Sequence, residues 1–174
     1  MNKNLNIEDN AKILKLSYIK KYYKQLINEA QATEMSYDSF LSLMLRNEVD
    51  QRKENGIRRK IRLAKFKELR YLEDYDTSVF KIDIQKQIKR LKSLSFIENH
   101  ENIILFGNPG VGKTHLATAL GVKACMNNLN VLFVHVPNLI IELKEAMSRT
   151  QFYKYKRQFN KYDLVILDEL GYIS

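Results

Sequence analysis

The chain has 174 residues, 45% of them hydrophobic, and a formal net charge of +9. This length allows one domain, or one domain with a small addition, and the hydrophobic content excludes a chain that is disordered throughout. The longest apolar runs are four residues and the chain begins without an apolar segment, so we expect neither a membrane span nor a signal peptide. The single cysteine, Cys125, excludes an internal disulfide and suits a reducing compartment, so we expect a soluble cytoplasmic protein.

Residues 1–66 are expected to form a small all-helical N-terminal domain. They contain no proline and one glycine, Gly56. A short helix is expected at residues 7–14, and Ser17 is expected to cap a second helix that runs to about residue 32. Ser36 is expected to cap a third helix, which continues into a basic segment unless Gly56 interrupts it.

Positive charge is concentrated in this first part of the chain. Residues 1–100 hold 21 Lys and Arg against 14 Asp and Glu, whereas residues 101–174 hold 8 against 6. Between Arg52 and Arg70 nine residues are basic and two are acidic. A basic helix attracts a polyanion, because each phosphate that it neutralises releases counterions from DNA. The predicted nucleic-acid contacts are Arg52, Lys53, Arg58, Arg59, Lys60 and Arg62. On charge alone, a solvated helix face is an equally good interpretation.

Residues 67–174 are expected to form a second domain, of the α/β class. After an entry segment, a helix is expected at residues 83–94. The run Ile103–Phe106 is short, apolar and followed by glycine, which predicts a buried strand, and residues 114–126 have helical spacing. Between them, Gly107 to Thr114 fits the pattern G-x-x-x-x-G-K-[ST] at every fixed position. Strand, glycine loop and helix are the context that identifies a phosphate-binding loop.

The residue types of this loop suit the phosphates of a nucleotide. Glycines let successive N–H groups turn inward around an anion, and the following helix adds the positive end of its dipole. Lys113 is expected to reach the β- and γ-phosphates, and the Thr114 hydroxyl to bind Mg²⁺. The predicted nucleotide contacts are Gly107, Asn108, Pro109, Gly110, Val111, Gly112, Lys113, Thr114 and His115.

Three elements are expected between this loop and the second motif. They are a strand at residues 131–134, a helix whose first turn holds Pro137, and a helix at residues 151–159. His135 ends the strand at the ligand side of the sheet. A contact with substrate or a role as base is open for it, but a structural hydrogen bond is the favoured interpretation.

The second motif is the apolar run at residues 164–167 followed by Asp168 and Glu169. A continuous apolar run is typical of a parallel strand covered on both faces, and ligands bind at the carboxyl ends of such strands. Asp168 is expected to hold Mg²⁺, usually through water, and Glu169 to orient and deprotonate the attacking water. The predicted catalytic residues are Lys113 and Glu169. The two motifs predict binding of a nucleoside triphosphate.

The segments at residues 107–117 and 162–172 resemble the IstB family. Its members are AAA+ ATPases that assist insertion-sequence transposases and are similar to DnaC-type replicative helicase loaders. The likeness extends to residues 14–16 and 36–41, to the basic stretch and to residues 72–76. It implies a P-loop NTPase of the AAA+ type with a parallel sheet and flanking helices.

The resemblance also implies a function and partners. It implies ATP and Mg²⁺ as cofactors, ATP-dependent assembly on duplex DNA, self-association through the ATP sites and no membrane. The helical domain would touch DNA or the transposase, and residues 71–76 would lie near the adenine. Two alternatives remain, namely a loader that binds a replicative helicase instead of a transposase, and a remnant without hydrolysis that binds only nucleotide or DNA.

The sequence departs from the family pattern at its end. An AAA+ module continues after the Asp168 strand with a fourth strand that carries a sensor residue, an arginine finger and a fifth strand, whereas this sequence ends at Ser174. The resemblance therefore predicts a fragment whose sheet is incomplete after that strand. Because an arginine finger contributes about 10³–10⁵ in rate, ATP hydrolysis is expected only at background level.

Overall fold

The computed structural model describes residues 6–170, so the last residues of the resembling segment, Gly171 and Tyr172, lie outside it. The chain divides into two compact units, Met1–Gly56 and Ile57–Ser174. The division falls inside a helix, earlier than residue 66. Among the described residues no helix is long and apolar enough to cross a membrane.

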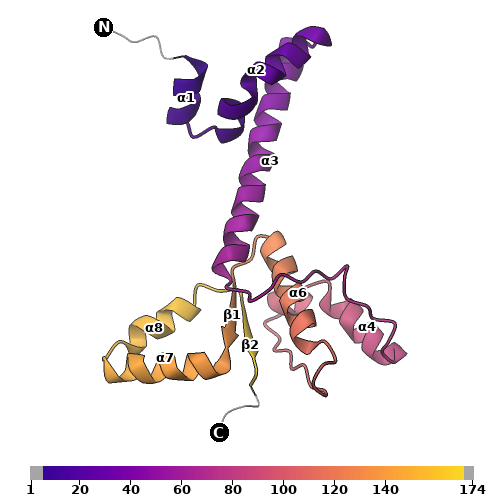
Figure 1. Cartoon of the computed structure of the whole chain (residues 1–174), viewed down its shortest axis with the longest axis vertical. Coiled ribbons are helices and arrows are strands. Elements are labelled where there is room, and N and C mark those ends of the chain that lie inside the picture. Colours follow the sequence, from indigo (N-terminus) through magenta and orange to yellow (C-terminus); the bar gives the residue numbers. More distant parts are fainter. Residues whose placement is uncertain (1–5, 171–174) are drawn as a thin grey trace. The chain divides into compact units, whose positions relative to one another are not determined.

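The first unit is helical. It contains α1 (Ile7–Ile13), α2 (Ser17–Ala32) and the first part of α3 (Tyr37–Leu63) (Figure 1). Gly56 does not interrupt α3, which continues into the basic segment. The N–H of Ser39 donates to Oγ of Ser36 at 3.3 Å, so Ser36 caps α3 as its sequence context predicts.

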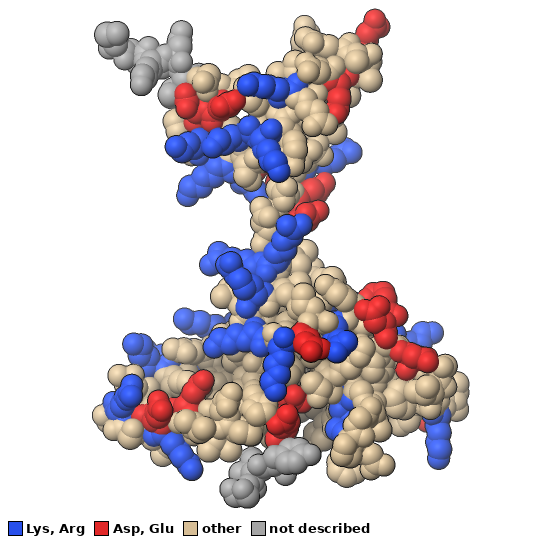
Figure 2. All heavy atoms as spheres, in the orientation of Figure 1, with Lys and Arg blue, Asp and Glu red and all other residues tan. Residues whose placement is uncertain are grey.

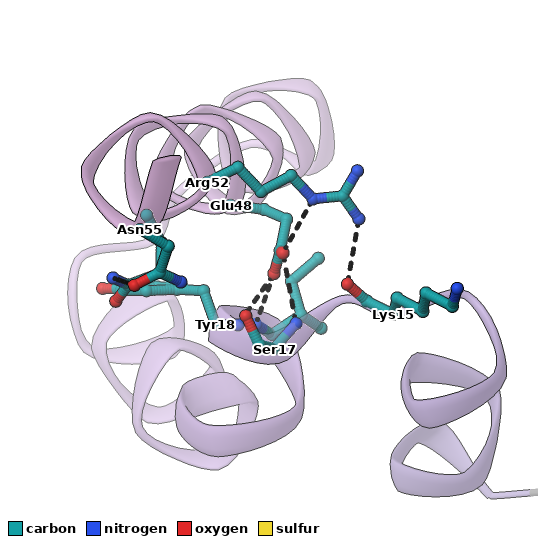
Figure 3. Close-up of polar contacts among 8 residues, drawn as sticks. Lys15, Ser17, Tyr18, Glu48, Arg52 and Asn55 are labelled. Carbon is teal, nitrogen blue, oxygen red and sulfur yellow. Dashed lines mark hydrogen bonds and ion pairs between the residues drawn. The ribbon is translucent and has the colours of Figure 1, made fainter. Parts of the chain in front are cut away.

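A buried carboxylate, that of Glu48 on α3, supplies the N-terminal cap of α2. It accepts hydrogen bonds from the backbone N–H groups of Ser17 (3.1 Å), Tyr18 (2.8 Å) and Ile19 (3.2 Å) (Figure 3). Glu48 is 3% exposed, and Nε of Arg52 donates to it at 3.2 Å. The charge suits the positive end of the helix dipole, and the three N–H groups have no partner within the helix.

The expectation that Ser17 caps α2 was therefore wrong. Ser17 is the first residue of the helix, and the N-cap position, Leu16, makes no side-chain hydrogen bond. A carboxylate from another helix replaces the local cap because it accepts from several N–H groups at once, which one hydroxyl cannot do.

We predict that Glu48→Ala lowers the thermal stability of the first unit. It removes three hydrogen bonds to a partly buried helix end, and leaving buried groups unsatisfied costs about 1–3 kcal/mol. Amide hydrogen exchange at residues 17–19 should accelerate together with a lower melting temperature by circular dichroism. Glu29→Ala is the matched control, because Glu29 is an exposed glutamate of the same unit. Equal behaviour of the two variants would contradict the capping role.

The second unit contains seven further helices and strands among its described residues. In chain order they are α4 (Ile82–Leu91), α5 (Ser95–Glu98), α6 (Lys113–Met126), β1 (Val131–His135), α7 (Val136–Ser148), α8 (Phe152–Phe159) and β2 (Leu164–Asp168). The one-turn helix α5 was not expected from the sequence. The other elements begin and end within about one helical turn of their expected bounds, and Pro137 lies in the first turn of α7.

A parallel pair of strands organises the second unit. β1 and β2 pair in register from Val131 opposite Leu164 to His135 opposite Asp168, and α7 and α8 form the crossover between them (Figure 1). On β1 the N–H of Phe133 also donates to the carbonyl of Ala64 at 2.8 Å. The chain that follows α3 therefore lies beside β1.

The expected strand at Ile103–Phe106 does not form. Among residues 6–170, β2 pairs only with β1, and nothing pairs with this segment. Leu105 packs on the core, while Ile104 is 87% exposed and Phe106 98% exposed. Only Leu105 of this apolar run is even partly buried, and a strand also needs a neighbour for its backbone N–H and C=O groups.

Helix α6 is the centre of the second unit. Eight of its residues are buried, including Gly121 and Cys125. Cys125 is fully buried, as expected for a small apolar residue, and burial raises the pKa of its thiol. Gly121 marks the closest approach of its neighbours, because a Cβ there would lie 2.7 Å from Cδ1 of Ile166 on β2 and 2.9 Å from the Phe66 ring.

We predict opposite effects for two glycine-to-alanine changes. Gly121→Ala should destabilise the chain by about 1–3 kcal/mol, because the methyl group overpacks the contact between α6 and β2. Gly56→Ala should stabilise it by about 0.5–1 kcal/mol, because a Cβ there meets nothing within 4 Å and alanine favours the interior of α3. Urea unfolding followed by circular dichroism measures both. A Gly121→Ala chain as stable as the parent would show that the contact relaxes freely.

Candidate functional site

The phosphate-binding loop leads directly into α6. Gly110 and Gly112 have φ angles of +82° and +87°, a region that side chains disfavour, and Gly112 is the N-cap of α6. α6 begins at Lys113 and has 14 residues. The loop therefore ends at the N-terminus of a full helix, where backbone N–H groups and the helix dipole favour an anion.

Lys113 folds back over this loop. Its Nζ donates to the carbonyl oxygens of Gly107 and Asn108, both at 2.8 Å. The ammonium group is thereby held on the loop by neutral acceptors. A phosphate placed there would offer a charged acceptor, and charge-assisted hydrogen bonds are roughly twice as strong as neutral ones.

The two motifs meet through Thr114 and Asp168. Oγ1 of Thr114 donates to Oδ1 of Asp168 at 2.9 Å, which joins the first turn of α6 to the carboxyl end of β2. The contact is exposed to solvent. The structure thus brings together the two residues that were predicted to bind Mg²⁺, although they are 54 positions apart.

Glu169 is held by a residue from the neighbouring strand. Nε2 of His135, the last residue of β1, lies 2.5 Å from Oε2 of Glu169. Glu169 has a φ of +61°, an uncommon value for a residue with a side chain, and such strained residues concentrate at functional sites. His135 therefore makes a hydrogen bond within the candidate site, and the sequence did not identify its partner.

Tyr75 lies against the end of the Gly107–Thr114 loop. A Cβ on Gly112 would lie 3.1 Å from its ring, and the ring packs edge-on to His115 with centroids 5.1 Å apart. Burial raises the pKa of Tyr75, which keeps its phenol neutral. Nε2 of His115 is buried without a hydrogen-bond partner among the described residues. The segment expected near the adenine is thus in contact with the nucleotide loop.

The predicted nucleic-acid residues divide between the units and differ in their partners. In the first unit, Arg52 donates to Glu48 and to the Lys15 carbonyl, and Lys53 lies 3.8 Å from Asp50. The second unit holds Arg58, Arg59, Lys60 and Arg62. Figure 2 shows Lys and Arg side chains gathered along the C-terminal part of α3.

Within this second group, Nζ of Lys60 donates to Oδ1 of Asn130 at 2.8 Å. Arg59 and Arg62 are exposed and make no ion pair with any residue of the described range. These two side chains are therefore open to a polyanion.

The residues present fit a magnesium nucleotide. Residues 6–170 contain no group of three or more His, Cys, Asp or Glu that could hold a metal alone. Mg²⁺ keeps several waters and takes phosphate oxygens, so it needs only one or two oxygen ligands from protein. Thr114 and Asp168 supply two such oxygens beside a loop suited to phosphates.

The sequence is similar to known proteins over most of its length. A model of the family described as IstB-like ATP binding protein matches residues 9–174. The chain is 34% identical over 160 residues to the protein named as ATP-binding in insertion sequence IS21 of Pseudomonas aeruginosa, covering 92% of this chain and 60% of that protein. It is 31% identical over 165 residues to the protein so named in IS232 of Bacillus thuringiensis subsp. berliner, covering 94% and 66%.

A relative from Bacteroides fragilis (strain YCH46), named as an IS21-like ATP-binding protein, is 29% identical over 167 residues, covering 92% of this chain and 80% of that protein. The chain therefore spans less than two thirds of the length of the IS21 and IS232 proteins. Because the family match covers nearly all of the sequence, including both nucleotide motifs, the chain belongs to the family of IstB-like ATP-binding proteins.

Proposed function

We propose that this chain binds ATP with Mg²⁺ in its second unit and assists DNA transposition of an insertion sequence. The observation that carries the proposal is the hydrogen bond between Thr114 and Asp168, beside the loop on which Lys113 lies. It joins the phosphate motif to the acidic motif in one site. The names of the relatives associate such proteins with insertion sequences.

In this proposal each side chain has a separate task. Lys113 binds the β- and γ-phosphates, while Thr114 and Asp168 hold Mg²⁺, which neutralises charge on the phosphates. Glu169 accepts a proton from the attacking water once its carboxylate is released from His135. Tyr75 and His115 border the loop where the base would lie.

The proposed partners are duplex DNA, a transposase and further copies of this chain. Duplex DNA suits the exposed cations of α3, and a transposase and further copies of this chain are partners that the family resemblance implies. The insertion-sequence relatives favour a transposase over a replicative helicase.

Nucleotide binding should depend on Lys113. Lys113→Ala removes the main side-chain charge on the phosphates and should weaken ATP binding at least tenfold, about 1.4 kcal/mol. Anisotropy of a fluorescent ATP analogue in the presence of Mg²⁺ measures the change. Lys86→Ala, at an exposed lysine of α4, is the control for loss of one positive charge. Unchanged binding by a folded Lys113→Ala chain would refute the proposed site.

Duplex binding should be sensitive to salt and centred on the end of α3. If about five cations meet phosphates, the logarithm of affinity should fall with the logarithm of salt concentration at a slope near −4 to −5. Charge reversal at Arg59 and Arg62 should flatten that slope by about 2, since each lost contact removes roughly 0.9.

The matched control is charge reversal at Lys86 and Lys89, two exposed lysines of α4 in the same unit. It changes net charge equally and should leave the slope nearly intact. Equal losses for both pairs would mean that overall charge, and not a surface on α3, holds the DNA. A parent slope near zero would remove the basis for DNA binding altogether.

A further inference from the structure

The second unit carries another basic surface, which is separate from the predicted nucleic-acid contacts on α3. Residues 149–161 include α8 and hold five basic and no acidic residues, the basic ones being Arg149, Lys154, Lys156, Arg157 and Lys161. All five are exposed, and none forms an ion pair with a residue in the described range. We call residues 149–161 the α8 surface. It is strongly positive over a short length.

Two aromatic rings are exposed on the α8 surface. Tyr153 is 79% exposed and Phe152 39% exposed, and their centroids lie 6.1 Å apart in an edge-to-face arrangement. A third aromatic residue of α8, Tyr155, connects the helix to α7. Its hydroxyl donates to Glu142 on α7 at 2.6 Å, and burial with this contact raises its pKa to about 12. Phe152 and Tyr153 thus remain open to a ligand.

The α8 surface continues into the basic end of α3. A hollow of about 250 Å³ is lined by Lys60 and Leu63 of α3 and by Lys161 and Tyr162 after α8. A second hollow of about 260 Å³ is lined by Lys65 and Lys67, which follow α3, and by Tyr155 and Phe159 of α8. Cations of both segments therefore border the first hollow, and α8 contributes aromatic rings to the second. Figure 2 shows basic side chains over this end of the unit as well, together with a few acidic ones.

We propose that the α8 surface binds unpaired DNA strand next to the duplex held by α3. In a duplex the faces of the bases are already stacked on one another, so exposed aromatic rings cannot stack on them. Unpaired bases stack on such rings regardless of sequence. The surrounding cations neutralise the phosphates of the same strand. The occupant is thus DNA with a locally open segment, and the inference rests on the proposed DNA binding by this chain.

Three DNA forms of equal length test the proposal, namely a full duplex, a duplex with a short unpaired bubble and a single strand, each with a fluorescent label. By anisotropy, the parent chain should bind the bubble roughly tenfold more tightly than the full duplex, equivalent to about 1.4 kcal/mol. The double variant Phe152→Leu with Tyr153→Leu keeps every charge. It should reduce this preference to less than twofold and leave affinity for the full duplex within twofold of the parent.

Tyr37→Leu is the matched control, because Tyr37 is 93% exposed and belongs to the first unit. It should keep the full preference for the bubble. A parent chain that binds duplex and bubble equally would overturn the α8 proposal while leaving duplex binding by α3 intact. A double variant that keeps its preference for the bubble would also overturn the α8 proposal. That result is expected if the α8 surface binds an acidic protein instead of DNA. Absence of binding to any DNA at low salt would instead refute the proposed DNA function itself.

Discussion

The candidate site depends on the parallel pairing of β1 with β2. That register places His135 opposite Asp168, so the two strands end side by side and Glu169 follows within reach of the imidazole. α6 packs against the same pair closely enough that Gly121 has no room for a Cβ. This close packing lets Thr114, in the first turn of α6, reach Asp168. One strand pair and one helix therefore bring the glycine loop, Thr114, Asp168 and Glu169 together.

β1 also connects the site with the basic end of α3. Near its first residue, Asn130 accepts from Lys60, and in its middle Phe133 donates to Ala64. At its last residue, His135 holds Glu169. Both the basic side chain and the carboxylate are thus bound to residues in or next to one five-residue strand. A polyanion that shifted the end of α3 would therefore act on the strand that positions His135, and so would connect the proposed DNA surface with the candidate site.

Much of this structure could be predicted from sequence, where the signal is local. The bounds of α2 and α6 follow from helical spacing, α6 begins at the end of the Gly107–Thr114 motif, and Asp168 ends a strand, all as expected. The errors concern long-range partners. Ser17 matches a local cap pattern, but the cap comes from Glu48, 31 residues away. The run at residues 103–106 has the composition of a strand, yet pairing requires a neighbour that composition does not reveal. The bond between His135 and Glu169 likewise depends on strand register.

Charge shows the same difference between composition and environment. In the sequence, the stretch from Arg52 to Arg70 is evenly basic. In the structure, Arg52 donates to a buried carboxylate, whereas Arg62 is exposed without an ion pair among the described residues. The second half of the sequence looked nearly neutral, because acidic residues elsewhere offset the five cations of residues 149–161. At physiological salt, screening limits the range of interactions between exposed charges to about 8 Å. A ligand therefore responds to the cations beside it and not to the net charge of a hundred residues. The local arrangement on α3 and α8 is therefore the relevant guide to where a polyanion would bind.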